Sequence, residues 1–271
     1  MTGSLTRGQR ESTDGERYFA VIDTETNRFD EVMSIGVVIA DAQSFLPTEQ
    51  KYYVLSPEYM VGGMFSGVLD IPLPCAKITA ARAETIADMR RLFGQFGVRS
   101  LFAYNANFDR GHLPEVDFAD WYDIMKVAVY RQFNAKIPKD APCCKTGRLK
   151  HGCGVQPIYR MLSGNGLYLE KHNALTDALD ELEIMRMLGH PLEVFKHPEI
   201  SSKKPSGKQT VKPPAKLPVI SEGTRVTVRE IGSGVITEVN DFIIKVRTEQ
   251  KVIAFTRRDA FEQGRLKIES K

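Results

Sequence analysis

The feature that most constrains this chain is an apolar run that ends in two acidic residues. Residues 18–22 (YFAVI) predict a strand that is buried on both faces. Side chains alternate along a strand, so Asp23 and Glu25 point to the same side. Two like charges at the end of a buried strand repel each other and lose water, and a hard divalent cation is the usual partner that offsets this cost. An isolated Asp-x-Glu is more often a polar strand end that meets solvent. The other motifs of this chain, described below, favour a cation site instead.

The apolar runs that follow predict an α/β domain over residues 17–195. Short links lead to two further strands at residues 32–40 and 51–55, which favours antiparallel neighbours. A fourth strand is expected at residues 101–104, and residues 121–124 are either a fifth strand or the entry to a helix. Helices are predicted at residues 83–96, 107–113, 125–133, 156–162 and 174–188. We therefore expect a mixed five-stranded sheet, with three antiparallel strands first, flanked by helices.

The two ends of the chain differ in composition from this domain. Residues 1–16 are polar and predict a disordered lead-in, and residues 136–154 predict a turn-rich excursion within the domain. Residues 196–219 are rich in Pro, Lys and Ser and predict an extended linker. Residues 220–271 contain short strands joined by tight turns, with a hairpin turn at residues 240–241, and predict a small all-β barrel.

Charge and cysteine usage narrow the function classes. Residues 196–271 carry 16 Lys and Arg against 9 Asp and Glu, a net +7, so residues 1–195 carry −4 of the total +3. A basic tail on a mildly acidic body points weakly to nucleic acid. The chain has no apolar run long enough for a membrane span and no signal peptide, so we expect a cytoplasmic protein without membrane contact. Cys143, Cys144, Cys153 and His151 resemble a zinc site poorly in spacing, which favours reduced thiols.

Two further motifs place chemically active residues where strands meet helices. Asp109 ends the sequence YNANFD just past the fourth predicted strand, and His172 and Asp177 delimit HNALTD at the start of the last helix. Taken singly, Asp109 could favour a helix start, His172 could be a surface histidine, and Asp177 could be a solvated helix residue. The ordered set Asp-x-Glu, Asn-x-x-x-Asp and His-x-Ala-x-x-Asp rarely arises by chance.

These three motifs, in this order, resemble those of the DEDDh 3′–5′ exonucleases of the ribonuclease H-like superfamily. That family includes polymerase proofreading subunits, oligoribonuclease and ribonuclease T. The resemblance covers residues 18–188. Tyr104 stands where the family's second motif often has His, and His172 places the chain in the h subclass, because a related subclass has Tyr there. The resemblance implies a 3′–5′ exonuclease that releases 5′-mononucleotides from DNA 3′ ends, with single strands preferred. An exoribonuclease of the same mechanism is the alternative within the enzyme class.

The resemblance also implies the roles of the site residues. A phosphodiester is an anion that an all-carboxylate pocket would reject, so two Mg²⁺ or Mn²⁺ ions about 4 Å apart are expected. By analogy, Asp23 bridges both ions, Glu25 and Asp177 bind the ion that holds the attacking water, and Asp109 reaches the second ion. His172 is the expected general base, because imidazole titrates near pH 6.5 in model peptides.

Substrate and partner contacts are predicted less directly. Phe65 either stacks on a base or packs into the core. Asn105 orients the strand, and Thr24, Thr26 and Phe108 complete the expected substrate-binding set. The C-terminal module resembles SH3-like or KOW/Tudor-like barrels and is expected to dock on nucleic acid, or on a polymerase or helicase partner. In a reading from another function class, the chain is an accessory subunit that docks through this barrel, and catalysis is secondary.

Overall fold

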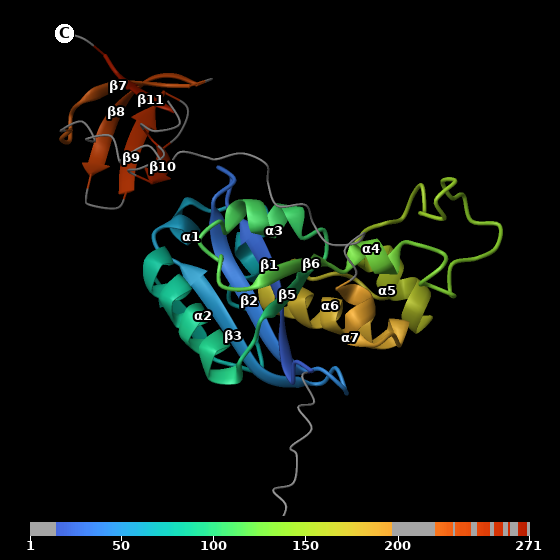
Figure 1. Cartoon of the computed structure of the whole chain (residues 1–271). Helices are drawn as coiled ribbons and strands as arrows, with labels where there is room; N and C mark the ends of the chain where they lie inside the picture. The colour runs from blue at the N-terminus through green and yellow to red at the C-terminus, as the bar shows by residue number, and fades with distance from the viewer. Residues whose placement is uncertain are drawn as a thin grey trace, which may run out of the picture.

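The chain forms a mixed α/β domain and a separate C-terminal antiparallel sheet (Figure 1). The computed structural model describes residues 15–196, 220–229, 231–239, 243–249, 252–256, 260 and 265–269. Most of the predicted lead-in, nearly all of the predicted linker and the hairpin turn at residues 240–241 lie outside the described residues. No helix in the described part of the chain has the length and apolar character needed to cross a membrane.

The large sheet confirms the predicted mixed topology and adds one strand. Its six strands run in the order β4-β3-β2-β1-β5-β6, with β1, β2 and β3 antiparallel and β5 and β6 parallel to β1. The strands are β1 (Tyr18–Thr26), β2 (Val32–Asp41), β3 (Pro47–Leu55), β4 (Lys77–Ala80), β5 (Ser100–Ala103) and β6 (Asp120–Asp123). The sequence did not reveal β4, because this four-residue strand pairs parallel to β3 at the edge and has no fully buried side chain to mark it.

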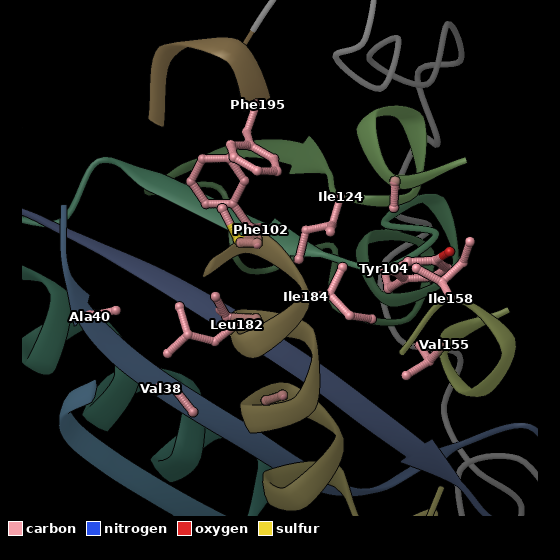
Figure 2. Packing of buried hydrophobic residues seen from close by; sticks show 14 of the residues in the cluster. Val38, Ala40, Phe102, Tyr104, Ile124, Val155, Ile158, Leu182, Ile184 and Phe195 are labelled. Atoms are coloured by element: carbon pink, nitrogen blue, oxygen red, sulfur yellow. The ribbon is translucent and has the colours of Figure 1, made fainter. Parts of the chain in front are cut away.

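Strand β1 is buried on both faces, as its composition predicts. Ala20 and Ile22 belong to the core beneath α2, whereas Phe19 and Val21 belong to the core beneath α6. Figure 2 shows the α6 side, where Leu182 of that helix lies beside Val38 and Ala40 of β2, and Ile184 lies beside Ile158 of α5. Because both faces are covered, the polar end of β1 is enclosed by the elements that follow it.

The helices flank the sheet on its two sides (Figure 1). They are α1 (Glu58–Val61), the 3₁₀ turn η1 (Ser66–Val68), α2 (Arg82–Phe96), α3 (Asn107–His112), α4 (Met125–Ala128), α5 (Val155–Ser163), α6 (Ala174–Leu188) and α7 (Leu192–Phe195). The helix predicted for residues 125–133 is only one turn long. The side-chain amide of Asn134 donates to the carbonyl of Ala128 (2.7 Å), the last residue of α4. The next carbonyl, that of Val129, accepts from the Leu149 N–H in the excursion, so the helix does not continue.

Residues 220–269 confirm a separate all-β unit. Its strands run in the order β10-β9-β8-β7-β11, and all the pairings are antiparallel. They are β7 (Arg225–Val228), β8 (Gly232–Val239), β9 (Ile243–Thr248), β10 (Val252–Thr256) and β11 (Leu266–Ile268). We call this unit the C-terminal sheet. Its core contains Val226, Ile236, Val246 and Phe255.

Candidate active site

The first turn of α6 lies directly against the sheet beside Asp23. Asp23 on β1 is opposite Gly36 on β2 in the antiparallel register. A Cβ atom on Gly36 would lie 2.2 Å from the carbonyl oxygen of Ala174, the first residue of α6. Only a glycine allows so close a backbone approach. This approach places Asp177, in the first turn of α6, next to the end of β1.

Asn173 holds the start of α6 in this position. Its side-chain oxygen accepts from the backbone N–H groups of Leu175 (3.2 Å) and Thr176 (3.3 Å), which is the usual N-cap arrangement. Its amide donates to the hydroxyl of Tyr52 (3.1 Å) and to the carbonyl of Val68 (2.9 Å). A buried residue that caps the helix and also bonds to β3 and η1 thereby anchors His172, the residue before it.

Asp109 reaches the site from α3, which begins just after β5. Its carboxylate is buried and accepts from the hydroxyl of Thr24 (2.7 Å), the residue between the two acidic positions of β1. Thr24, which we expected to bind substrate, therefore links β1 to α3. Tyr104 has a similar structural contact, because its hydroxyl donates to the carbonyl of Cys153 (2.6 Å) in the excursion.

The structure brings the five predicted catalytic residues together. Ligand atoms of Glu25, His172 and Asp177 all lie within 4.8 Å of one another, and within the described residues this is the one group of three potential metal ligands. The backbone of His172 is left-handed (φ 55°). Its imidazole stacks on the ring of Phe65, with centroids 4.2 Å apart and planes at 21°.

The electrostatics of the site are those of acidic groups packed together. Burial, reinforced by the neighbouring carboxylates, raises the pKa of Asp23 well above its ordinary value. The pKa of Glu25 is raised to about 8, first by burial and then by the Asp177 charge. Burial and adjacent acidic groups also raise the pKa of Asp177 to about 8. Burial raises the pKa of Asp109 to about 7, although the Thr24 hydrogen bond opposes the shift.

These observations fit a site for divalent cations. The Oδ2 atom of Asp23 is buried and has no hydrogen-bond partner among the described residues. The carboxylate oxygens of Glu25 and Asp177 are ligands that Mg²⁺ and Mn²⁺ prefer, and the imidazole of His172 lies beside them. A cation bound at Asp23 would satisfy its orphaned oxygen, and a cation held by Glu25 and Asp177 would stabilise their charged forms.

The other predicted substrate-binding residues differ in how far their side chains are exposed. Phe108 is 41% exposed, with its ring 4.4 Å from that of His112. Asn105 is exposed and left-handed (φ 63°), and Thr26 is half-buried at the end of β1. Phe65 packs on His172 and against the core, which matches the second of the two roles that its sequence position left open.

Sequence reasoning missed a further acidic residue, Glu181. It is buried, lies one helical turn beyond Asp177, and accepts from the backbone N–H of Tyr104 (3.0 Å). The Glu181 charge is the largest carboxylate contribution to the raised pKa of Asp23. Its spacing of four residues from Asp177 was the available signal, because residues i and i+4 share a helix face.

Comparisons with known proteins give likenesses of low identity. No family model matches the chain, and no curated protein matches it. Among solved structures, a 3′-exonuclease recognising a histone mRNA stem-loop has a TM-score of 0.42 and 15% identity over 64% of this chain and 64% of that chain. Exonuclease I of E. coli bound to an oligonucleotide has a TM-score of 0.43 and 13% identity, over 64% of this chain and 40% of that chain. The exonuclease I of Methylocaldum szegediense has a TM-score of 0.44 and 15% identity, over 84% of this chain and 54% of that chain.

Each of these matches spans less than two thirds of the other chain's length. The TM-scores are all below 0.5, so the likenesses do not by themselves assign a function to this chain.

Proposed function

We propose that this chain is a metal-dependent 3′–5′ exonuclease that releases 5′-mononucleotides from DNA 3′ ends, with single strands preferred. The observation that carries the proposal is the convergence of four carboxylates from β1, α3 and α6 with the imidazole of His172. These residues belong to the three motifs that resemble the DEDDh exonucleases. The likeness of the motifs supports the polarity, and the carboxylate site supports a requirement for cations.

The residues have distinct roles in the proposed reaction. Two Mg²⁺ or Mn²⁺ ions, when bound, would supply the positive charge that a phosphodiester needs in an acidic pocket. Asp23, Glu25 and Asp177 would hold one ion, and Asp23 and Asp109 the other. His172 accepts a proton from the attacking water, whose oxygen bonds to the terminal phosphorus. The bond from phosphorus to the 3′ oxygen of the preceding nucleotide breaks, and that oxygen takes a proton to become the new 3′ hydroxyl.

The proposal is tested by incubating the whole chain with 5′-labelled oligonucleotides, with Mg²⁺ or Mn²⁺ and with chelator. We expect a ladder of shortened strands from single-stranded DNA, less shortening of duplex DNA, and none in chelator. Asp23→Ala and Asp177→Ala should abolish the ladder. Asp117→Ala serves as the matched control, because Asp117 is an exposed carboxylate that pairs with Arg90 (3.0 Å). Turnover of the Asp23 or Asp177 variant near the wild-type rate would refute the proposal.

His172→Ala isolates the general base. We expect kcat to fall by about two to four orders of magnitude, as is usual when a base is removed. Binding of Mn²⁺, measured by calorimetry, should be largely retained because four carboxylates remain. A pH–rate profile identical to that of the wild type would exclude His172 from the base role.

The same assay decides between DNA and RNA. An RNA strand of equal sequence, shortened faster than the DNA strand, would make the chain an exoribonuclease of the same mechanism. The accessory-subunit alternative requires docking through residues 220–271. A pull-down of polymerase or helicase with the whole chain, compared with a chain ending at residue 195, tests it directly.

A further inference from the structure

Glu181 is a buried acidic residue that the proposed reaction does not use. Its side chain lies on α6, one turn beyond Asp177, and only 2% of the residue is exposed. Burying a carboxylate is costly unless it is hydrogen-bonded, and a Leu at this position would carry no such cost. We therefore expect the buried Glu181 carboxylate to make a specific hydrogen bond.

That contact is with the backbone at the end of β5. The Tyr104 N–H donates to Glu181 Oε2 (3.0 Å), and the next amide, that of Asn105, donates to Asp123 Oδ1 on β6 (3.0 Å). Both carboxyl groups are buried, so these hydrogen bonds pair acceptors that water does not reach. Two consecutive amides are thus held by two buried carboxylates from different elements, and the chain turns there into α3.

We propose that Glu181 is a positioning residue for the metal site. Its hydrogen bond ties α6, which carries Asp177, to the turn that delivers Asp109 from α3. Asp109 is in turn fixed to β1 by Thr24. The bond closes a ring of contacts through β1, α3 and α6, and so sets the spacing between the carboxylates on which cation binding depends.

The test separates the hydrogen bond from the charge. Glu181→Gln keeps an oxygen that can accept from Tyr104, whereas Glu181→Met has a similar length and no such acceptor. We expect Mn²⁺ to bind the Met variant at least about tenfold more weakly, the range seen when groups that orient metal ligands are removed, and the Gln variant within about threefold of wild type. Glu183→Met is the matched control, because Glu183 lies on the same helix and pairs with Arg186 in a partly exposed ion pair.

Calorimetric titration with Mn²⁺ measures binding without any nuclease activity. Only the catalytic readout of this inference rests on the proposed function. In that readout, we expect kcat of the Met variant to fall at least about tenfold while KM for the oligonucleotide is unchanged. An inactive wild type that still binds Mn²⁺ more tightly than the Met variant would refute the nuclease and retain the positioning role.

Two results would overturn the positioning role. One is a folded Met variant that binds Mn²⁺ as the wild type does, and the other is a Gln variant as impaired as the Met variant, since charge would then be the decisive property. Thermal melts followed by circular dichroism establish folding. Glu181→Ala, which leaves room for water, replaces the Met variant if the latter does not fold.

Discussion

At the scale of the residue, the site is governed by the cost of burying carboxylates together. Asp109, Asp177 and Glu181 are each at most 3% exposed, and Asp23 has a buried oxygen without a hydrogen-bond partner in the part of the chain that the structure describes. Like charges in a medium of low dielectric constant disfavour ionisation, and cations reverse that preference. Protons and metal ions therefore compete for the same oxygens.

This competition predicts how stability depends on pH. In chelator, the pKa of Glu25 and Asp177 is about 8 and that of Asp109 about 7, whereas carboxyl groups of an unfolded chain titrate near pH 4. Between these values the native state holds more protons than the unfolded state, so the free energy of unfolding falls as pH rises from about 5 to about 8. Thermal melts in chelator should show this fall, and Mn²⁺ should offset it most at the alkaline end. A Tm that rises over this range in chelator would contradict the assignment.

The contact between Phe65 and His172 gives a second prediction at this scale. Phe65→Leu removes the ring that packs on the imidazole but keeps an apolar side chain. We expect kcat to fall while KM for the oligonucleotide stays near the wild-type value, because the Phe65 ring orients the imidazole, and we expect Phe65→Tyr to keep the wild-type kcat. Steady-state kinetics on one labelled strand measures both constants. A raised KM with unchanged kcat would instead make Phe65 a stacking platform for a base.

At the scale of the element, the placement of α6 depends on one close approach to the sheet. The helix itself was predictable, because its apolar residues recur at helical spacing and Gly189 ends it with φ 69°. The position of its first turn was not predictable, because it depends on Gly36, a residue without a side chain that lies far from α6 in the sequence. The strand β4 and the short α4 were misjudged for a related reason: their limits are set by tertiary hydrogen bonds rather than by local pattern.

Gly36→Ala tests this placement. The new Cβ would lie 2.2 Å from the backbone of Ala174, so α6 must shift away from β2. We expect a loss of about 2–4 kcal/mol in the free energy of unfolding and weaker Mn²⁺ binding, because Asp177 moves with the helix. Urea unfolding and calorimetry measure the two effects. Gly94→Ala in α2 is the matched control, where nothing lies within 4 Å, and it should raise stability by about 0.5–1 kcal/mol. Equal effects of the two substitutions would contradict this explanation.

At the scale of the whole molecule, the C-terminal sheet contacts the turn that follows β1. The rings of Phe29 and Phe255 are stacked, with centroids 5.2 Å apart and planes at 5°. Arg265 donates to the carbonyl of Phe29 (2.8 Å), and its guanidinium lies 4.2 Å from the centre of the Phe29 ring. The turn between β1 and β2 thus carries this contact a few residues beyond the site carboxylates.

Phe29→Ala should loosen the C-terminal sheet without unfolding the α/β domain. The substitution removes an aromatic stack worth about 1 kcal/mol beyond the burial of its area, together with the cation–π contact of Arg265. Hydrogen exchange should become faster in residues 220–269, and small-angle scattering should show a larger radius of gyration. Phe108→Ala, an exposed phenylalanine elsewhere in the domain, is the control. Unchanged exchange in the Phe29 variant would show that the stack does not hold the sheet in place.

The sequence alone determined the alternation of strands and helices, the order of the acidic motifs and the division into two units. These properties are local, because periodicity, capping and composition act within a few residues of the chain. The tertiary structure alone decided that Thr24 binds Asp109, that Phe65 covers His172, and that Glu181 joins the buried carboxylates. These contacts join segments far apart in sequence, and those of His172 and Glu181 depend on the glycine in β2 that lets α6 lie against the sheet.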